Sequence, residues 1–399
     1  MQDLIFAFRT LWKSPMFTAV AVISLGLGIG ANTAIFSVTN SLLVRPLNVE
    51  GPEGLTLVYT SQTGGQLHGN TSLPDYLDYR DRSEVFSGLA AYTMAPMAII
   101  GDGAPRVGLG QLVSWDYFAV LGVEPILGRG FLPEEDQELG ANPVAVLSHK
   151  TWQTLFDSDP EVLGRVVRIN DSPFVVVGVA PAGFVGLMPI MEPDLWAPLA
   201  MLDEALPFTP NIQSRIDPWL QIVGRLEEGV SPAEAQAAMD VLAANLAEEY
   251  PETNRNKGIV LGEIENGRLV SPEAMEGSKR LLTVLFAVVG FVLLVACFNV
   301  AILQLAKATA RRREIALRVS LGASRLRIVR QLLVESVVLA LLAGGLGVGL
   351  AVLAIDAIKT LQPQMELPLQ IPVSLDVPVL GFTLLLAVVT GMVFGLAPA

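Results

Sequence analysis

Residues 306–336 read AKATARRREIALRVSLGASRLRIVRQLLVES, and this stretch places eight basic residues between two long apolar runs. Between Lys307 and Arg330, Glu314 is the only acidic residue. Short loops rich in Lys and Arg stay on the cytoplasmic side of a membrane, because translocating them is costly. We therefore predict a cytoplasmic loop at 306–331. Once this loop is placed in the cytoplasm, the side of the membrane on which each other segment lies follows.

Four apolar runs are long enough to cross a hydrocarbon core, which takes about 20 residues. The chain has 399 residues, is 52% hydrophobic and has a mean hydropathy of +0.52, and this excess is concentrated in these runs. The sequence predicts a four-span α-helical bundle with a large α+β extracytoplasmic domain between the first two spans. The expected spans are 16–40, 281–305, 332–353 and 377–397.

Charge supports this topology. Residues 41–280 contain 15 basic and 33 acidic residues, so we place them on the extracytoplasmic side of the membrane. Arg9 and Lys13 precede the first span and keep the N-terminus cytoplasmic; the C-terminus after the fourth span is then cytoplasmic too. Residues 41–280 offer no basic face to neutralise phosphates, so nucleic acid is not an expected partner.

The first 15 residues predict an amphipathic cytoplasmic helix along the inner membrane face, with Trp12 at headgroup depth. A cleaved signal peptide is the alternative. The apolar run that follows is longer than a signal peptide core and lacks an A-x-A site, so an uncleaved anchor is favoured.

Glycines spaced four apart recur in three of the expected spans. Small residues let the backbones of membrane helices approach, because lipid supplies no hydrophobic drive for association. We interpret these glycines as packing positions between helices or protomers, with flexibility during a conformational cycle as the alternative. The positions are Gly26, Gly30, Gly345, Gly349, Gly391 and Gly395.

Residues 41–280 alternate strand and helix signals. Strands are expected at 55–59, 97–100 and 107–113, with a helix at 74–82. A second unit has strands at 219–226 and 258–262 around a helix that begins after the capping residue Ser231. Two β-α-β units around an insertion predict a sandwich whose sheet is completed by both ends of the segment.

The insertion, about 115–200, has its own signals. A strand at 143–148, a helix at 150–156 and a hairpin of strands 166–170 and 174–179 are expected, with the hairpin turned by Asp171, Ser172 and Pro173. The loop 183–193 is rich in Gly, Pro and Met, which leaves two interpretations: an interface or a lid over the core.

The sequence offers no catalytic, cofactor-binding or metal-binding constellation. His68 and His149 are the only histidines and lie far apart, Cys297 is the only cysteine, and neither GxSxG nor GxxxxGK[ST] occurs. We interpret 134–136, in LPEEDQE, as a solvated turn. Glu335 and Asp356 lie near the ends of the third span, where anchoring is favoured over a proton relay.

The basic loop itself predicts two helices with a break between them. The helix of the second span can continue to about residue 321, Gly322 can end it in a left-handed conformation, and Ser324 can cap the next. This elbow either contacts lipid headgroups or docks on a cytosolic protein.

Several stretches together resemble the MacB and FtsX family of ABC-transporter permease subunits, in particular its duplicated orphan permeases. The resemblance covers nearly the whole chain. It rests on RRREIALRVSLGAS and RIVRQLLVES in the loop, TAVAVISLGLGIGANTAIFSVTNSLLVRPL in the first span, and PDYLDYRDRSEVFSGLAAY, WDYFAVLGVEPILGRGF and FVVVGVAPAGF outside.

The resemblance implies a MacB-like core domain at 41–280 and an FtsX-like permease domain at 281–399. The core would have a porter-like half at 50–114 and 205–265 and an inserted half at 115–204. An ABC ATPase subunit would rest on the loop, and its closure would move the spans and lever the core domain. The candidate ATPase-coupling residues are Arg311, Arg312, Arg313, Glu314, Arg318, Gly322, Ala323 and Ser324.

The resemblance also implies a homodimer, or a tandem pseudo-dimer with a second unit, in contact with membrane lipid. Related chains continue past the point where this one ends at GLAPA, so we expect a truncated chain or half of a tandem protein. The alternative function is a membrane-anchored regulatory or scaffold protein that binds an envelope protein without transport.

Overall fold

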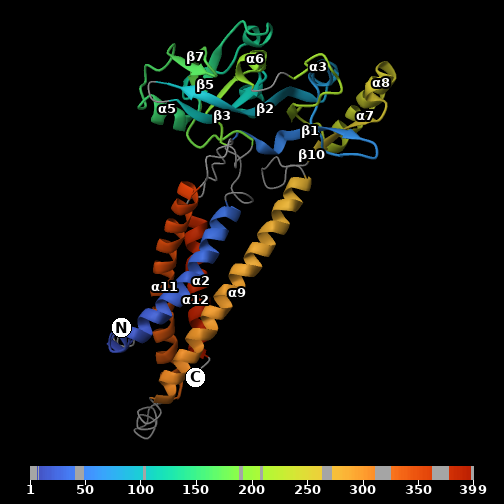
Figure 1. Cartoon of the computed structure of the whole chain (residues 1–399). Helices are drawn as coiled ribbons and strands as arrows, with labels where there is room; N and C mark the ends of the chain where they lie inside the picture. Colours follow the sequence, from blue (N-terminus) through green and yellow to red (C-terminus); the bar gives the residue numbers. More distant parts are fainter. Residues whose placement is uncertain are drawn as a thin grey trace. The chain divides into compact units, whose positions relative to one another are not determined.

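The computed structural model describes residues 7, 9–40, 49–101, 105–187, 192–206, 210–262, 272–310, 325–361 and 377–396. The chain divides into two compact units. The helical unit holds the long apolar helices, and the sheet unit holds the strands (Figure 1). Each unit is described by itself.

Four long helices make up most of the described part of the helical unit. Three contain a stretch long and apolar enough to cross a membrane, at Pro15–Ser37, Lys279–Ala306 and Leu333–Ala354, and the last helix carries a shorter apolar run, Pro378–Met392. The four predicted runs are therefore helical, and three meet the length of a span. The helices are α2 (Pro15–Thr39), α9 (Pro272–Ala310), α11 (Arg325–Leu361) and α12 (Val377–Leu396).

The described strands of the sheet unit form one 10-stranded sheet in the order β10-β1-β9-β2-β3-β8-β5-β7-β4, with β6 paired to β2 and β7. The strands are β1 (Leu55–Gln62), β2 (Phe86–Ile100), β3 (Arg106–Val113), β4 (Leu127–Gly128), β5 (Val144–Leu147), β6 (Val166–Ile169), β7 (Ser172–Val179), β8 (Leu195–Pro198), β9 (Gln221–Leu226) and β10 (Lys257–Gly262).

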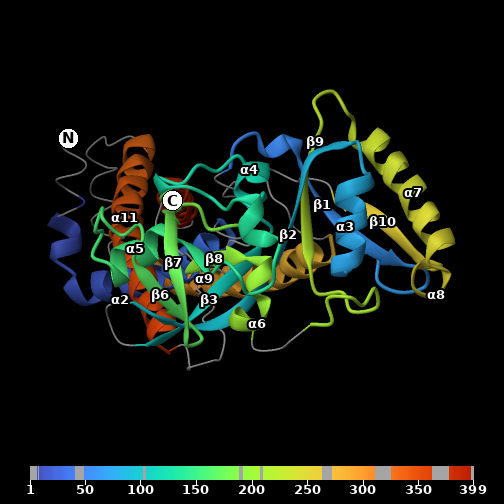
Figure 2. The same cartoon turned by 90° about the horizontal axis from the view of Figure 1, so that it is seen from above.

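Short helices connect these strands. Ser231 caps the longest of them in a reciprocal capping box with Glu234, as the sequence predicts, and this helix runs alongside β10 (Figure 2). The α-helices are α3 (Leu73–Arg82), α4 (Tyr117–Leu121), α5 (His149–Leu155), α6 (Leu202–Ala205), α7 (Pro232–Glu249) and α8 (Pro251–Asn254), and the 3₁₀ turns are η2 (Pro52–Gly54), η3 (Pro133–Asp136) and η4 (Leu199–Met201).

The two predicted β-α-β units are confirmed, and they interleave. The first is β1-α3-β2 and the second is β9-α7-β10, and β9 lies between β1 and β2 while β10 lies outside β1. The inserted half does not form a separate sheet. Its strand β8 pairs in parallel with β3 over Gly110–Val113, so the sheet continues across the boundary.

Strand β2 is much longer than the expected 97–100. Its sequence contains Gly88 and Pro96, which weaken a strand signal. Pro96 is tolerated because it pairs with Leu109 of β3 on one side only: pairing with β9 ends at Tyr92, and pairing with β6 begins at Ile99. The missing N–H of the proline therefore disrupts no ladder.

The predicted hairpin exists as β6–β7, but its turn is shifted. Asn170 and Asp171 have φ of 46° and 71°, and Ile169 pairs directly with Ser172. Ser172 and Pro173 therefore lie in β7 and not in the turn. Two positive φ values match the right-handed twist of a tight hairpin, and Asn and Asp accept them at low cost.

The prediction of a solvated turn at 134–136 is wrong for two of its three residues. Glu135 is buried, and its carboxylate accepts two hydrogen bonds from Arg129 and one from the Leu132 N–H. Asp136 accepts from the N–H of Trp115 through Oδ2 and of Ala200 through Oδ1, at 3.1 and 2.8 Å. The turn thus joins the two chain segments that enter and leave the inserted half.

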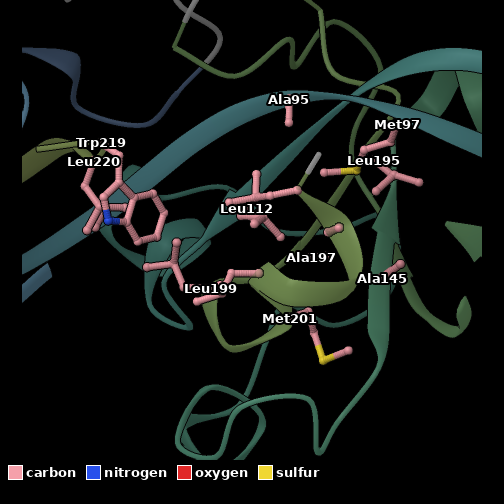
Figure 3. Close-up of a cluster of buried hydrophobic side chains, with 14 of the residues drawn as sticks. Ala95, Met97, Leu112, Ala145, Leu195, Ala197, Leu199, Met201, Trp219 and Leu220 are labelled. Atoms are coloured by element: carbon pink, nitrogen blue, oxygen red, sulfur yellow. The ribbon is translucent and has the colours of Figure 1, made fainter. Parts of the chain in front are cut away.

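The core of the sheet unit is shared by its two halves. Figure 3 shows Leu112 of β3 beside Leu199 of η4, with Trp219 and Leu220, which precede β9, in the same cluster. On the other face, Phe184 packs on Trp196 with ring centroids 5.2 Å apart. Phe184 and Leu187 are buried, so the described part of the loop 183–193 covers the core.

Candidate functional site

The strands β1 and β10 connect the sheet unit to the helices. β1 is the first strand after α2, and β10 is the last described strand before α9. They pair with one another antiparallel, in a register that runs from Leu57↔Gly262 to Gln62↔Lys257. We call β1 and β10 the tether pair. Both connections to the membrane helices therefore leave the sheet from adjacent strands.

A side chain reinforces the tether pair at the end where both connections leave it. Thr56 is buried, and its Oγ1 donates a hydrogen bond of 2.6 Å to the carbonyl of Gly262, the last residue of β10. The two strands are thus joined by ladder hydrogen bonds and by this side-chain contact.

The other end of β10 is anchored to a buried carboxylate, Asp75 on α3. Its side chain is fully buried and accepts from Arg215 and Asn254 through Oδ1 (2.6 and 2.9 Å) and from Lys257 and Ser72 through Oδ2 (2.8 and 2.9 Å). Lys257 is the first residue of β10. The carboxylate therefore ties β10 to α3, to α8 and to the segment before β9.

Burial raises the pKa of Asp75, but the hydrogen bonds from Lys257 and Asn254 outweigh it and hold the pKa below its ordinary value. Arg215 also donates to Asp78 and lies over the ring of Tyr250, 3.7 Å from its centroid. A buried charge is stable only when it is paired and hydrogen-bonded, and these contacts meet that condition.

The outer edge of β10 is held by α7. The side chain of Gln236 donates to the carbonyl of Ile259 and accepts from the N–H of Leu261, both at 2.8 Å. A primary amide carries one acceptor and two donors, so it can bond the edge of a strand as another strand would. Gln236 thereby fixes β10 to the helix beside it.

In the helical unit, α2 contacts α9 through its own backbone and one amide. Asn32 Nδ2 donates to the carbonyls of Gly28, on its own helix, and Val289 on α9, at 2.8 and 3.0 Å. A Cβ at Gly28 would lie 3.1 Å from Leu293 Cα, so the two backbones are close. The two helices that precede and follow the tether pair in the chain therefore touch each other.

Glycines bring α2 against α11. A Cβ at Gly30 would lie 2.8 Å from the carbonyl oxygen of Gly347, and a Cβ at Gly26 would lie 3.0 Å from the side chain of Leu346. Gly391 of α12 likewise faces α11, where its Cβ would be 3.0 Å from Val337 Cα. Gly347 was not among the predicted positions, although it lies between Gly345 and Gly349.

Gly345 and Gly349 differ from these glycines. Among the described residues, no atom lies within 4 Å of a Cβ built at either position. They point away from the other described helices of this chain. The surroundings of Gly395 lie outside the described residues.

Helix α12 contacts α2 through a hydroxyl pair and a ring pair. Thr33 and Thr383 are buried with their hydroxyl oxygens 3.0 Å apart, and the rings of Phe36 and Phe382 stack with centroids 4.2 Å apart. Gln304 of α9 and Ser336 of α11 form a further polar contact of 3.2 Å. Helix α2 thus touches all three other long helices.

Residues 18–242 match the MacB-like periplasmic core domain, and residues 286–399 match the FtsX-like permease C-terminal domain. The chain belongs to the MacB/FtsX family of ABC-transporter permeases. This membership makes it a bacterial membrane protein with a large extracytoplasmic domain, which is the sheet unit.

Relatives of the permease include the macrolide export ATP-binding/permease protein MacB of Campylobacter jejuni, 28% identical over 96% of this chain and 55% of the relative. MacB of Escherichia coli K12 is 29% identical over 72% of this chain and 40% of the relative. The permease thus spans about half the length, or less, of these curated relatives.

Solved structures similar to the permease include the periplasmic region of MacB from Actinobacillus actinomycetemcomitans. It is 13% identical, with a TM-score of 0.40, over 57% of this chain and 92% of that one. A domain of a permease protein from Porphyromonas gingivalis is 16% identical, also with a TM-score of 0.40, over 57% and 97%.

The predicted coupling residues of the permease, within 311–324, lie outside the described residues. Within the described ranges, no group of three or more His, Cys, Asp or Glu side chains is placed to hold a metal ion. Sequence reasoning did not find the tether pair or the contacts of Asn32 and Thr383. A polar residue inside an apolar run was the available signal for the last two.

Proposed function

We propose that this permease transmits ATPase-driven motion of its membrane helices to the extracytoplasmic unit, for export or extraction of a substrate. The observation that carries the proposal is the tether pair. The two helices on either side of the extracytoplasmic unit in the chain, α2 and α9, contact each other, and the two strands that follow and precede them are hydrogen-bonded to each other.

A displacement common to α2 and α9 pulls β1 and β10 in the same direction. A sliding of one helix along the other instead shears the strand pair. Six residue pairs and the Thr56–Gly262 contact resist that shear together, because ladder hydrogen bonds act in parallel across the pair. The strands then move as one body, and Lys257 and Gln236 carry the movement to α3 and α7.

The source of the motion in this proposal is an ABC ATPase that binds the cytoplasmic loop 306–331. Permeases of this family work with such an ATPase, and the loop carries eight basic residues and Glu314, which can pair with acidic and basic side chains of a partner. Arg312, Glu314 and Arg318 are the positions we assign first to the coupling.

The arrangement we propose has four spans, with α12 as the fourth and both ends of the chain cytoplasmic. A second unit, from another copy or a tandem repeat, would pack on α11 at Gly345 and Gly349. Supporting this, both glycines are open in the described structure, and small residues favour close helix contacts in lipid.

The test is co-purification of the full chain with candidate ABC ATPases in nanodiscs, with measurement of the ATPase rate. Alanine at Arg312, Glu314 and Arg318 is expected to lower the permease-dependent rate at least 10-fold; Arg255→Ala, an exposed arginine of the sheet unit, is the matched control and should leave it unchanged.

Absence of association, or equal rates in all variants, contradicts the proposal. Crosslinking of the inserted half to an envelope protein, without any ATPase association or substrate movement, would instead favour the scaffold function.

A further inference from the structure

Arg225, on β9, binds three backbone carbonyls that belong to two parts of the sheet unit. Its Nη2 and Nη1 donate to the carbonyls of Glu50 and Gly51, at 2.7 and 3.1 Å, and its Nε donates to the carbonyl of Val120 at 2.7 Å. Glu50 and Gly51 lie between α2 and β1, and Val120 lies on α4 of the inserted half. One guanidinium thus joins the connection from α2 to the inserted half.

A direct contact accompanies this link. Gly122 ends α4 with φ of 65°, and a Cβ there would lie 2.8 Å from Glu50 Cβ. The chain that follows α4 therefore rests against the segment that precedes β1. Arg225 itself is firmly placed, because its backbone lies between Leu55 of β1 and Gly88 of β2.

The boundary between the two halves leaves room for movement at this point. A cavity of about 370 Å³ lies beside Arg225 and is lined from both halves, by Tyr79, Phe86 and Leu89 on one side and Trp115, Ala119 and Val120 on the other. The sheet crosses the boundary at two short pairings, β3 with β8 over four residue pairs and β2 with β6 over two. The movement that this allows is a small twist about these two pairings.

Asp136 supplies the pivot for such a twist. It accepts hydrogen bonds from the N–H groups of Trp115 and Ala200, which are the two connections of the inserted half. A force applied at Val120 therefore acts on the inserted half, whose two chain connections are both held by Asp136. Helix α4 carries Val120 and packs on β2 and β9, so the inserted half meets the porter-like half at this helix.

We propose that Arg225 couples displacement of the segment after α2 to a twist of the inserted half against the porter-like half. Arginine suits this role, since its planar fork offers five donors and holds several carbonyls in a fixed geometry, whereas lysine offers a single flexible ammonium. The inference goes beyond transmission through the tether pair, and its test needs neither an ATPase nor a substrate.

The experiment uses the full chain in nanodiscs, with Cys297→Ser as background and spin labels at Gln153→Cys on α5 in the inserted half and Ala244→Cys on α7, both exposed. Pulsed EPR gives the distance distribution between the labels. Hydrogen exchange is followed in parallel at residues 49–54 and 117–123. Arg225→Met is compared with Arg225→Lys and with Arg255→Met, the latter an exposed arginine in the porter-like half.

Arg225→Met is expected to broaden the distance distribution and to speed exchange at least 10-fold in both segments, with β2 and β3 unchanged. Arg225→Lys should give an intermediate result and Arg255→Met none. Gly122→Ala, which strains the contact with Glu50 without removing Arg225, should also shift the distribution.

An unchanged distribution in Arg225→Met, with faster exchange confined to 49–54, would show that Arg225 only fastens that segment. Loss of protection in β2 and β3 would make it a folding residue. Either result overturns the proposal and leaves the ATPase experiment to decide the proposed function on its own.

Discussion

In the extracytoplasmic unit, buried charged side chains join the elements to one another. The buried polar side chains described in the helical unit are neutral. Asp75, with Arg215 and Lys257, represents the first kind, and Asn32 and the Thr33–Thr383 pair represent the second. An unpaired charge costs far more in lipid than an amide or hydroxyl, and small residues bring helices together without one. The difference shows two ways of joining elements that must move together.

The largest expected effect is at Asp75. Asp75→Ala leaves Arg215 and Lys257 without their shared carboxylate, and breaking a buried ion pair in this way costs about 4 kcal/mol of unfolding free energy. The control is Asp81→Ala, whose side chain is 61% exposed, with an expected effect within about 0.5 kcal/mol. Chemical unfolding followed by tryptophan fluorescence measures both, since four of the five tryptophans lie in the extracytoplasmic unit. Equal effects would show that the network does not anchor β10.

A smaller effect is expected where α2 meets α11. Gly30→Val places a Cβ about 2.8 Å from the Gly347 carbonyl oxygen and forces the helices apart, at a cost of about 2 kcal/mol. Gly381→Val, on α12, is the matched control, because no described atom lies within 4 Å of its Cβ and no contact is assigned to it. Thermal melting in detergent, followed by helical circular dichroism, compares them. A larger loss at Gly381 than at Gly30 would contradict the assigned contact within the chain.

A third prediction concerns Asp136, which forms no ion pair with the residues that the structure describes. Burial raises the pKa of Asp136 to about 6, and the hydrogen bonds from Ala200 and Trp115 offset it only in part. A raised carboxyl pKa means that the folded state binds the proton more tightly, so stability falls as pH rises from about 4 to about 6.

Lowering the pH from about 7 to about 5 should therefore raise the unfolding free energy by about 1 kcal/mol through this group. Asp136→Asn removes that part of the pH dependence. The same pH profile in both proteins would place the titration elsewhere. Asp75, whose pKa is lowered, titrates below this window and contributes nothing to it.

The smallest effect is expected for a neutral contact in the helical unit. Thr383→Val removes the hydroxyl partner of Thr33 at nearly constant volume, and such contacts in membranes are worth about 0.6 kcal/mol. Thermal melting of Thr383→Val, Thr33→Val and the double variant measures the coupling. A coupling as large as that of the Asp75 network would remove the contrast between the two units.

Much of the secondary structure could be predicted, because local signals determine it. Ser231 with Glu234 and the strand signals at 55–59 and 107–113 are visible in the chain itself. The errors lie where distant residues decide. The stretch LPEEDQE predicts a solvated Asp136. Its carboxylate instead accepts hydrogen bonds from the N–H groups of Trp115 and Ala200, which are distant in the sequence.

Less of the candidate site than of the fold could be predicted from the sequence. The glycine spacing predicts close helix packing but not which glycines meet, because α2 contacts Gly347 and leaves Gly345 and Gly349 open. The role of Arg225 has no signature in the sequence, since its three acceptors are backbone carbonyls. Backbone groups are present at every residue and carry no residue identity.

By itself, the sequence determined the class of protein: the apolar runs, the basic loop 306–331 and the acidic segment 41–280 act through hydropathy and charge, which need no tertiary structure to be read. Only the tertiary structure decided that β1 and β10 lie side by side, that the inserted half continues the same sheet, and that Asp75 and Arg225 are junctions. Pairing between strands about 200 residues apart depends on the register of the whole sheet, which no local stretch encodes.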